Sequence, residues 1–341
     1  MYRMKAAVIE SVNRIIVKEV LFPELVPGNT VVKVAYAGLC GPTDEAILKG
    51  LHPRAKFPLV LSHEFSGEIA FIEDGVEGLN KGDKVVINPL LSCNNCSTCR
   101  NGNQYICENL RLIGIDTDGG FAEYCSVPLN NIVLLPGDMP LNIAALSEPM
   151  AVGIHAVKEA GLRMGESAIV FGAGPIGLFV AEACRKAGAV DITIVEINKK
   201  RLEFARETGY NVIDADSLNL NSSFHKYDFI FDTTGSPEVL KVLLNYSKTK
   251  GTIVIVGKFD NMELFDLHTV LFNELKIIGA RVYRENEFLL AVQILSENPQ
   301  RYNKFISDYF PIEKIEDVFS AFRNRNNLGR VMVKFDLKKG E

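Results

Sequence analysis

The sequence predicts an α/β protein with a β-rich first part and a parallel sheet in its second part. Up to about residue 150, short runs rich in β-branched residues alternate with turn signals, and we expect strands there. These runs lie at residues 5–10, 30–37, 67–72, 83–87 and 121–127. Beyond about residue 150, strands alternate with helical periods, which is the order of a parallel sheet.

The second part supplies the elements of that parallel sheet in sequence. Strands are expected at residues 167–171, 191–196, 229–232, 252–256 and 275–278, and helices at 175–187, 199–208 and 237–246. The alternation ends near Arg284, and a final β-like run at 330–335 is expected to rejoin the first domain. We therefore predict domains at 1–150 and 151–285, with a return segment at 286–341 that completes the first. A chain of 341 residues, 47% of them hydrophobic, can support a core in each.

Composition excludes several classes of function. The net charge is −5, and no basic stretch with interleaved aromatic residues appears, so nucleic acid is not an expected partner. No apolar run reaches the roughly 18 residues that would suggest a membrane span. The chain begins Met1-Tyr2-Arg3 without an apolar signal segment. We therefore expect a cytoplasmic protein with small-molecule partners.

The strongest metal signal is a cluster of cysteines with the spacing C-x2-C-x2-C-x7-C, namely Cys93, Cys96, Cys99 and Cys107. Four thiolates suit one tetrahedral zinc and leave no coordination position for water or substrate, so we expect a structural site. The alternative is a pair of disulfides or a redox switch. The expected reducing compartment favours the metal.

A dinucleotide-binding motif opens the second part. The apolar run 168–171 leads directly into a G-x-G-x-x-G turn and a helical pattern, and the acidic Glu196 ends the next expected strand. Glycines allow the backbone to approach a pyrophosphate, and the helix N-terminus offers N–H donors to it. The predicted cofactor-binding residues of the turn are Gly172, Gly174, Pro175, Ile176 and Gly177.

Glu196 favours NAD over NADP. Its carboxylate can accept both ribose hydroxyls of NAD and would repel the additional phosphate of NADP. Lys199, Lys200 and Arg201 follow closely and would partly offset that repulsion, so NADP stays the alternative. Of these three, Arg201 is included among the predicted cofactor-binding residues.

Cys40 and the pair His63-Glu64 form a second candidate metal site. A thiolate, an imidazole and a carboxylate suit catalytic zinc, which needs three protein ligands and one open position. A lone cysteine and a His-Glu pair are also common in ordinary protein cores, so the surrounding motifs decide between the two interpretations.

Several motifs in a fixed order make the chain resemble the zinc-dependent medium-chain alcohol dehydrogenases. They lie at 40–44, 62–67, 93–107, 119–124, 148–152, 172–177 and 273–279. The resemblance is greatest to the polyol, sorbitol and sugar dehydrogenase branch, because Glu148 stands where other branches have a cysteine or aspartate. It implies a GroES-like β-barrel catalytic domain and a Rossmann doubly wound domain, with the active site between them.

The resemblance also implies roles for residues of the second metal site. Cys40 and His63 would be zinc ligands. Glu64 would be a third ligand or an alternating partner, and Glu148 a ligand or the holder of the zinc-bound water, which leaves open which glutamate binds. Asp44 would orient the histidine ligand, with an N-cap for a helix at 45–49 as the alternative.

Thr43 would be the hydroxyl that removes the alcohol proton, although this chain departs from the family pattern around it. The family hydroxyl normally follows the cysteine by two positions, where Pro42 stands here, and Glu45 replaces a relay histidine. Ser62 occupies a position that is usually glycine. Arg330 matches a family position that contacts the pyrophosphate, or it is a surface arginine.

Together these features predict an enzyme with two zinc ions per chain that transfers a hydride between NAD and a secondary alcohol of a polyol, sugar or sugar acid. Zinc would lower the pKa of the alcohol, and hydride would pass to the nicotinamide. The alternatives are a threonine, diol or simple alcohol dehydrogenase, and a non-catalytic nucleotide-binding relative with one structural zinc. The resemblance further implies a homodimer or homotetramer.

Overall fold

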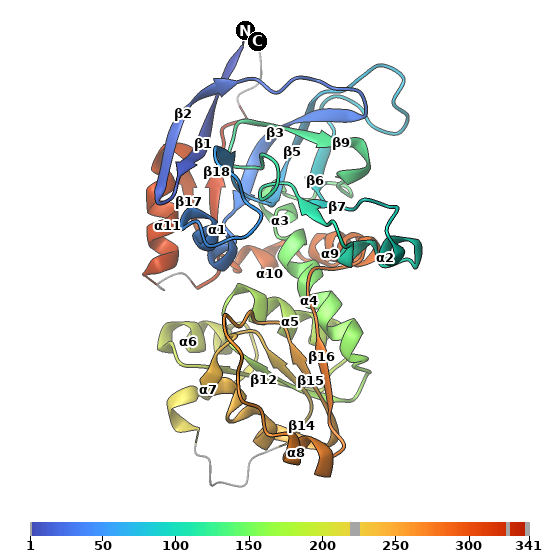
Figure 1. The fold of residues 1–341 in the computed structure, drawn as a ribbon, viewed down its shortest axis with the longest axis vertical. Helices are drawn as coiled ribbons and strands as arrows, with labels where there is room; N and C mark the ends of the chain where they lie inside the picture. The colour runs from blue at the N-terminus through green and yellow to red at the C-terminus, as the bar shows by residue number, and fades with distance from the viewer. Residues whose placement is uncertain (1, 219–225, 325–327, 338–341) are drawn as a thin grey trace. The chain divides into compact units, whose positions relative to one another are not determined.

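The computed structural model describes residues 2–218, 226–324 and 328–337, which form two compact units (Figure 1). The first unit comprises Met1–Glu148 and Arg284–Glu341, and the second comprises Pro149–Tyr283. The chain thus leaves the first unit once and returns to it. No helix among the described residues combines the length and the apolar character that crossing a membrane requires.

The first unit is built mainly of antiparallel strands. One sheet has the order β2-β1-β4, and a larger one has the order β10-β6-β5-β3-β18-β17 with β9 also paired to β3. Their bounds are β1 Arg3–Ser11, β2 Arg14–Leu21, β3 Asn29–Gly38, β4 Leu59–Val60, β5 Glu64–Phe71, β6 Lys84–Ile87, β9 Tyr124–Pro128, β10 Ile132–Leu134, β17 Ile306–Pro311 and β18 Arg330–Lys334. Strands β7 Leu90–Leu91 and β8 Arg111–Leu112 pair antiparallel as a separate two-stranded sheet.

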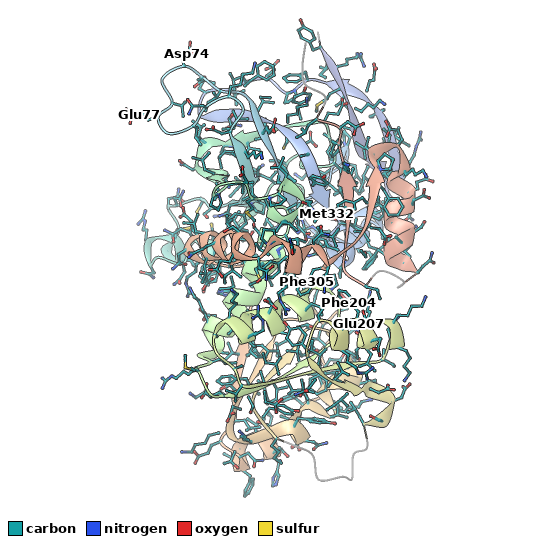
Figure 2. All side chains as sticks on the ribbon, turned by 180° about the vertical axis from the view of Figure 1, so that it is seen from behind. Asp74, Glu77, Phe204, Glu207, Phe305 and Met332 are labelled. Carbon is teal, nitrogen blue, oxygen red and sulfur yellow. The ribbon has the colours of Figure 1, made fainter. Side chains whose placement is uncertain are left out.

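The return segment is part of the larger sheet. Strand β18 is apolar and almost wholly buried, and it pairs antiparallel with β3 so that Met332 lies opposite Gly38. Met332 lies among the side chains of this unit, whereas Asp74 and Glu77 lie on the loop after β5 that extends away from the sheet (Figure 2). The last strand therefore lies in the same sheet as β3.

Short helices complete the first unit. They are α1 Gly41–Leu48, α2 Ser97–Arg100, α3 Leu141–Ala144, α9 Glu285–Glu297, α10 Pro299–Asn303 and α11 Ile315–Arg323, while α4 Ser147–Ala160 leads into the second unit. The core of the first unit combines residues of both sheets with the inner faces of α1 and α11, including Ile47, Phe65, Val318 and Phe319, all at most 1% exposed.

The second unit has a six-stranded parallel sheet with the order β13-β12-β11-β14-β15-β16. Its strands are β11 Ser167–Phe171, β12 Asp191–Glu196, β13 Asn211–Asp214, β14 Tyr227–Asp232, β15 Ser247–Ile255 and β16 Lys276–Gly279. The helices are α5 Pro175–Lys186, α6 Lys199–Glu207, α7 Pro237–Leu240 and α8 Leu267–Phe272. Strands β12 and β13 are added on one side of β11, and the later strands on its other side. Dinucleotides bind at such a switch point.

The predicted strands are all present, and those at 167–171 and 191–196 have the predicted bounds. The single helix predicted at 237–246 is wrong: α7 ends at Leu240, and a separate 3₁₀ turn spans Leu243–Tyr246. Strands β2, β13 and β17 were not predicted, because each has a mostly half-buried or exposed face and lacks a clear apolar alternation.

Candidate metal centres and cofactor site

Helix α1 positions the first predicted ligand. The helix begins at Gly41, so Cys40 is its N-cap, and the Oδ2 of Asp44 accepts a hydrogen bond from the Cys40 backbone N–H at 2.9 Å. Asp44 therefore lies inside the helix, and the alternative that it caps a helix at 45–49 is wrong. Pro42 fits in the first turn, where a missing N–H costs no intrahelical bond.

The second ligand pair lies where the chain enters β5. Ser62 precedes His63 and has φ +77, a left-handed conformation that glycine adopts without strain. This explains why glycine is usual at that position. The serine hydroxyl donates to the carbonyl oxygen of Gly38 at 2.8 Å, so its added polar group is satisfied within the sheet.

Cys40, His63 and Glu64 meet in one cluster, with one potential ligand atom from each lying within 4.8 Å of the others, and Cys40 is partly exposed. His63 is 5% exposed and Glu64 is fully buried. Glu148, in the first turn of α4, is close enough for its charge to raise the pKa of His63. The structure thus brings the two glutamates to the same neighbourhood, and Glu64 is the one within the trio.

The cluster fits a cation. The Nδ1 of His63, both carboxylate oxygens of Glu64 and the Oδ1 of Asp44 are buried without a hydrogen-bond partner among the described residues. Burial by itself lowers the pKa of His63, but the charge and hydrogen bond of Cys40, with Glu148 and Asp44, raise it to about 10. Such an environment favours positive charge, and a divalent ion with thiolate, imidazole and carboxylate donors meets that requirement.

Arg330 supplies a positive charge beside this cluster. It is 4% exposed, its Nη2 lies 2.8 Å from the Oε1 of Glu64, and its Nη1 donates to the carbonyl of Leu39 at 3.3 Å. The 2.8 Å contact is an ion pair without hydrogen-bond geometry. This pair was not predicted from the sequence. The alternative that Arg330 is a surface arginine is wrong, because the residue is buried. Its expected contact with a pyrophosphate stays a prediction.

Thr43 lies in the first turn of α1, three residues after the cysteine, and is partly exposed. Residues three apart on a helix are neighbours on its surface. The role of Thr43 in removing the alcohol proton stays a prediction.

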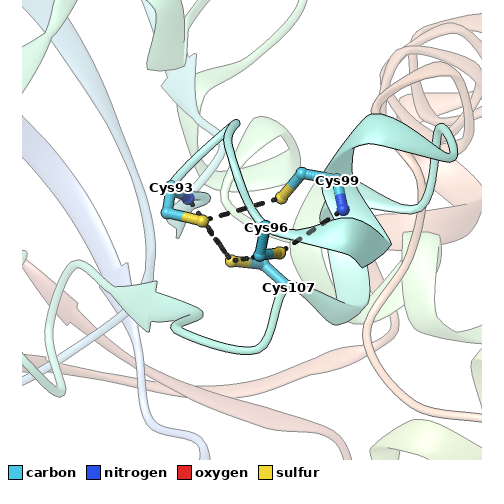
Figure 3. A group of neighbouring side chains, drawn as sticks. All are labelled: Cys93, Cys96, Cys99 and Cys107. Atoms are coloured by element: carbon cyan, nitrogen blue, oxygen red, sulfur yellow. Dashed lines mark hydrogen bonds between the residues drawn. The ribbon is translucent and has the colours of Figure 1, made fainter.

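The four predicted cysteines form a separate cluster (Figure 3). Sulfur–sulfur distances are 4.0 Å for Cys93 and Cys99, 3.9 Å for Cys96 and Cys107, and 3.3 Å for Cys93 and Cys107. A tetrahedral site with metal–sulfur bonds of about 2.3 Å has sulfur–sulfur edges of about 3.8 Å. All four are free thiols, so the disulfide alternative is not what this structure contains.

Backbone N–H groups prepare the cluster of four cysteines for metal binding. The N–H groups of Asn95 and Cys96 donate to the sulfur of Cys93 and lower the pKa of its thiol to about 6. Helix α2 begins after Cys96, whose sulfur accepts from the N–H of Cys99 at 3.4 Å. Thiolate stabilisation by N–H donors and a closed set of four sulfurs are typical of a structural zinc site.

The predicted cofactor turn lies between β11 and α5. Gly172 has φ +102, and a Cβ on Gly177 would lie 1.9 Å from the carbonyl oxygen of Gly172. Glycine is therefore needed at both positions for the turn and for close packing of the helix. Gly174 is the N-cap of α5, with Pro175 and Ile176 in its first turn, so the helix N–H groups remain available to a phosphate.

Glu196 lies at the end of β12 beside this turn. Its Oε2 accepts from the N–H of Ala173 at 2.8 Å, and its Oε1 accepts from Ile197 and Asn198 at 2.9 and 2.8 Å. Three backbone donors thus fix the orientation of this carboxylate, and the residue is only 8% exposed. The sequence predicted its position but not its bond to the glycine turn.

The basic residues after Glu196 differ in their surroundings. The ammonium of Lys199 forms ion pairs with Asp214 and Asp216, which balance its positive charge. Arg201 approaches the turn, because a Cβ added to Gly174 would lie 3.9 Å from its Nη1. Among these residues Arg201 is the one that the structure brings to the predicted phosphate-binding turn.

A dinucleotide-type parallel sheet joined to a strand-rich unit with two metal-ligand clusters defines the zinc-dependent dehydrogenase class. Comparison with known proteins agrees. Residues 26–137 match the alcohol dehydrogenase GroES-like domain, and residues 175–297 match the zinc-binding dehydrogenase domain. Among curated relatives, the 2-dehydro-3-deoxy-L-galactonate 5-dehydrogenase of Pseudoalteromonas atlantica is 34% identical over 87% of this chain and 88% of its own length.

Two further proteins support the same assignment. D-altritol 5-dehydrogenase of Agrobacterium fabrum is 30% identical over 90% of this chain and 93% of its own. A protein of Sinorhizobium meliloti crystallised with NADP is 28% identical, with a TM-score of 0.93 over 98% of this chain and 100% of its own. The chain therefore belongs to the zinc-dependent medium-chain alcohol dehydrogenase family.

Proposed function

We propose that this protein oxidises a secondary alcohol of a polyol, sugar or sugar acid with NAD as hydride acceptor. The observation that carries the proposal is the meeting of Cys40, His63 and Glu64, where the buried Nδ1 of His63 and both carboxylate oxygens of Glu64 have no hydrogen-bond partner among the described residues and suit a catalytic zinc. The two curated relatives described above are named as acting at position 5 of a sugar acid and of a six-carbon polyol, and such carbons bear secondary hydroxyls.

Cys40, His63 and Glu64 would hold the catalytic zinc, with Glu148 beside them. Bound there, zinc would supply Lewis-acid polarisation of the alcohol oxygen and lower the pKa of the hydroxyl. Asp44 holds the Cys40 backbone, and Arg330 holds the carboxylate of Glu64. Thr43 would take the hydroxyl proton while it releases its own to solvent water. Bound NAD would accept the hydride of the carbinol carbon, so the alcohol would lose a proton and a hydride and become a ketone.

A second zinc would be held by the four cysteines. The sulfur–sulfur distances of 3.3–4.0 Å support this, because they are close to the edges of a zinc–sulfur tetrahedron. With no open position, this ion would stabilise the lobe at 93–107 and take no part in the reaction.

The preference for NAD follows from local charge. The Glu196 carboxylate is held beside the glycine turn by three N–H donors, and the ammonium of Lys199 is paired with two aspartates. A 2′-phosphate beside Glu196 would meet like-charge repulsion that Arg201 and Lys200 would have to offset. The Sinorhizobium meliloti relative was crystallised with NADP, so the two cofactors must be compared directly.

Two copies of the chain would associate through the edge of the parallel sheet at β16. This edge strand is largely exposed, and α8 next to it exposes Leu267, Leu271 and Phe272 by 69%, 72% and 71%. An exposed strand edge flanked by large apolar side chains is an aggregation hazard unless it is covered. A second copy would cover it by pairing edge to edge, giving a homodimer or a homotetramer of such dimers.

The function is tested by measuring NADH formation with a panel of polyols, aldoses, sugar acids, threonine, diols and simple alcohols, with and without a chelator. We expect turnover of a polyol, sugar or sugar acid that the chelator abolishes. Turnover of threonine or a simple alcohol alone would overturn the substrate class. Silence across the panel with one zinc per chain would favour the non-catalytic alternative.

The two metal sites should respond differently to loss of one thiol. Cys40→Ser is expected to reduce zinc from two to one per chain and turnover by at least about a thousandfold, while NAD binding persists. Cys99→Ser is expected to lower thermal stability strongly, because the lobe loses its metal. Elemental analysis, NAD titration and thermal unfolding check both variants, and full turnover by Cys40→Ser would sink the assignment.

Removal of the Glu196 charge should weaken the preference for NAD. Glu196→Gln is expected to reduce the ratio of kcat/KM for NAD over NADP by about tenfold, which corresponds to about 1.4 kcal/mol. The matched control is Glu203→Gln, which removes the same charge from the exposed face of α6 and should leave the ratio within about twofold. An unchanged ratio in Glu196→Gln would contradict the electrostatic explanation.

Association is tested at the exposed face of α8. Leu271→Asp places a charge at the proposed interface and is expected to convert the oligomer to monomer in size-exclusion chromatography with light scattering. Val190→Asp changes an equally exposed apolar residue of the same unit and should leave the mass unchanged. A monomeric wild-type protein would contradict the proposed association. An oligomer that persists in Leu271→Asp would mean that the interface lies elsewhere.

A further inference from the structure

We propose that Glu45 and Arg323 are positioning residues that hold helix α1, and with it Cys40 and Thr43, in the orientation that the reaction requires. The inference deepens the proposed function and rests on it. It assigns a role to Glu45, which stands in place of the family's relay histidine.

The pair joins segments from opposite ends of the chain. Arg323, the last residue of α11, donates its Nε–H to both carboxylate oxygens of Glu45 at 3.1 Å. Glu45 is 8% exposed, so its carboxylate is largely shielded from water. The guanidinium also lies over the ring of Phe319, 5.9 Å from the centroid, which restricts its orientation.

A second contact lies one helical turn away. The ring of Phe322 packs against Gly41 so closely that a Cβ there would lie 2.0 Å from the ring carbon Cε2. The last turn of α11 therefore contacts α1 at Gly41 and at Glu45, four residues apart on one face. Two contacts along one helix fix its tilt and rotation. Gly41 adjoins Cys40, and Glu45 lies two residues after Thr43, so the ligand and the hydroxyl lie within this supported turn.

The same contacts argue against Glu45 as a proton carrier. Both oxygens face Arg323, and the Oε1 also lies 3.1 Å from the Nζ of Lys49. Burial raises the pKa of Glu45, but these hydrogen bonds outweigh it and hold the pKa below the usual value for glutamate. A carboxylate so engaged is a poor acceptor at neutral pH, which leaves the pair to act through the orientation of α1.

The test compares Glu45→Gln, Arg323→Met and the double variant with wild type, using the substrate identified by the panel. We expect kcat to fall roughly tenfold in each single variant and no further in the double variant, with KM for NAD and zinc content unchanged. The shape of the pH–kcat profile should also stay unchanged. Arg323→Lys should restore most of kcat, and the control Lys49→Met, which removes the exposed partner of Glu45, should match wild type within about twofold.

Three results would overturn the proposal: additive losses in the double variant, unchanged kcat in both single variants, and a pH–kcat profile altered by Glu45→Gln but not by Arg323→Met. The last would identify Glu45 as a proton relay. Hydrogen exchange at 41–48 provides a readout independent of turnover, and we expect faster exchange in both single variants. If the wild-type protein turns over no substrate, the proposed function fails. Unchanged hydrogen exchange at 41–48 in both single variants would separately reject the positioning role of Glu45 and Arg323.

Discussion

The metal site depends on a concentration of acidic groups in a buried place. Cys40, Asp44, Glu64 and Glu148 converge around His63, and Arg330 is the cationic side chain that the described residues place against them. Burying carboxylates without compensation is costly, and the cations Arg330 and protonated His63 are fewer than the acidic groups around them. A divalent cation would balance the remaining charge, so the arrangement suits a metal site better than an ordinary protein core.

This concentration is possible because the two ends of the chain meet. Strand β3 ends at Gly38 and leads through Leu39 to Cys40, while β18 pairs with β3 and begins at Arg330. The backbone bond between the Leu39 N–H and the carbonyl of Val331 fixes this register. This register brings the guanidinium of Arg330 to the end of β3. Glu64, the first residue of β5, lies opposite Gly38 at the same end. The return segment is therefore needed to assemble the site as well as to complete the sheet.

The chain's motifs were predictable where chemistry and spacing lie within one short segment. The four cysteines, the glycine turn and the pair His63-Glu64 belong to this kind, because each local pattern has few alternative uses. The α/β fold class was equally accessible, since apolar periodicity changes from one half of the chain to the other. The broken helix at 237–246 shows the limit, because local propensity does not reveal that Leu243–Tyr246 packs as a 3₁₀ turn in the core.

Interactions between distant segments were not predictable. The Arg330–Glu64 pair joins residues far apart in sequence, and spacing carries no information about such a pair. The departure at Ser62 has a comparable explanation, because only the backbone conformation shows that this position is left-handed and that the hydroxyl finds the carbonyl of Gly38. Both cases concern the interactions that orient a candidate metal ligand. The ligands themselves were predictable from their residue types.

The two glutamates near the metal site differ in their partners, and this difference constrains their roles. Glu64 lies against Arg330 and beneath Gly38, where a Cβ would lie 2.6 Å from its Oε2, so its carboxylate has little freedom to move. Glu148 lies in the first turn of α4, where the helix dipole favours its negative charge, and acts on His63 through its field. A carboxylate confined by an arginine and a glycine suits a fixed ligand. One at a helix start, outside the trio, suits a group that orients water or substrate beside the metal.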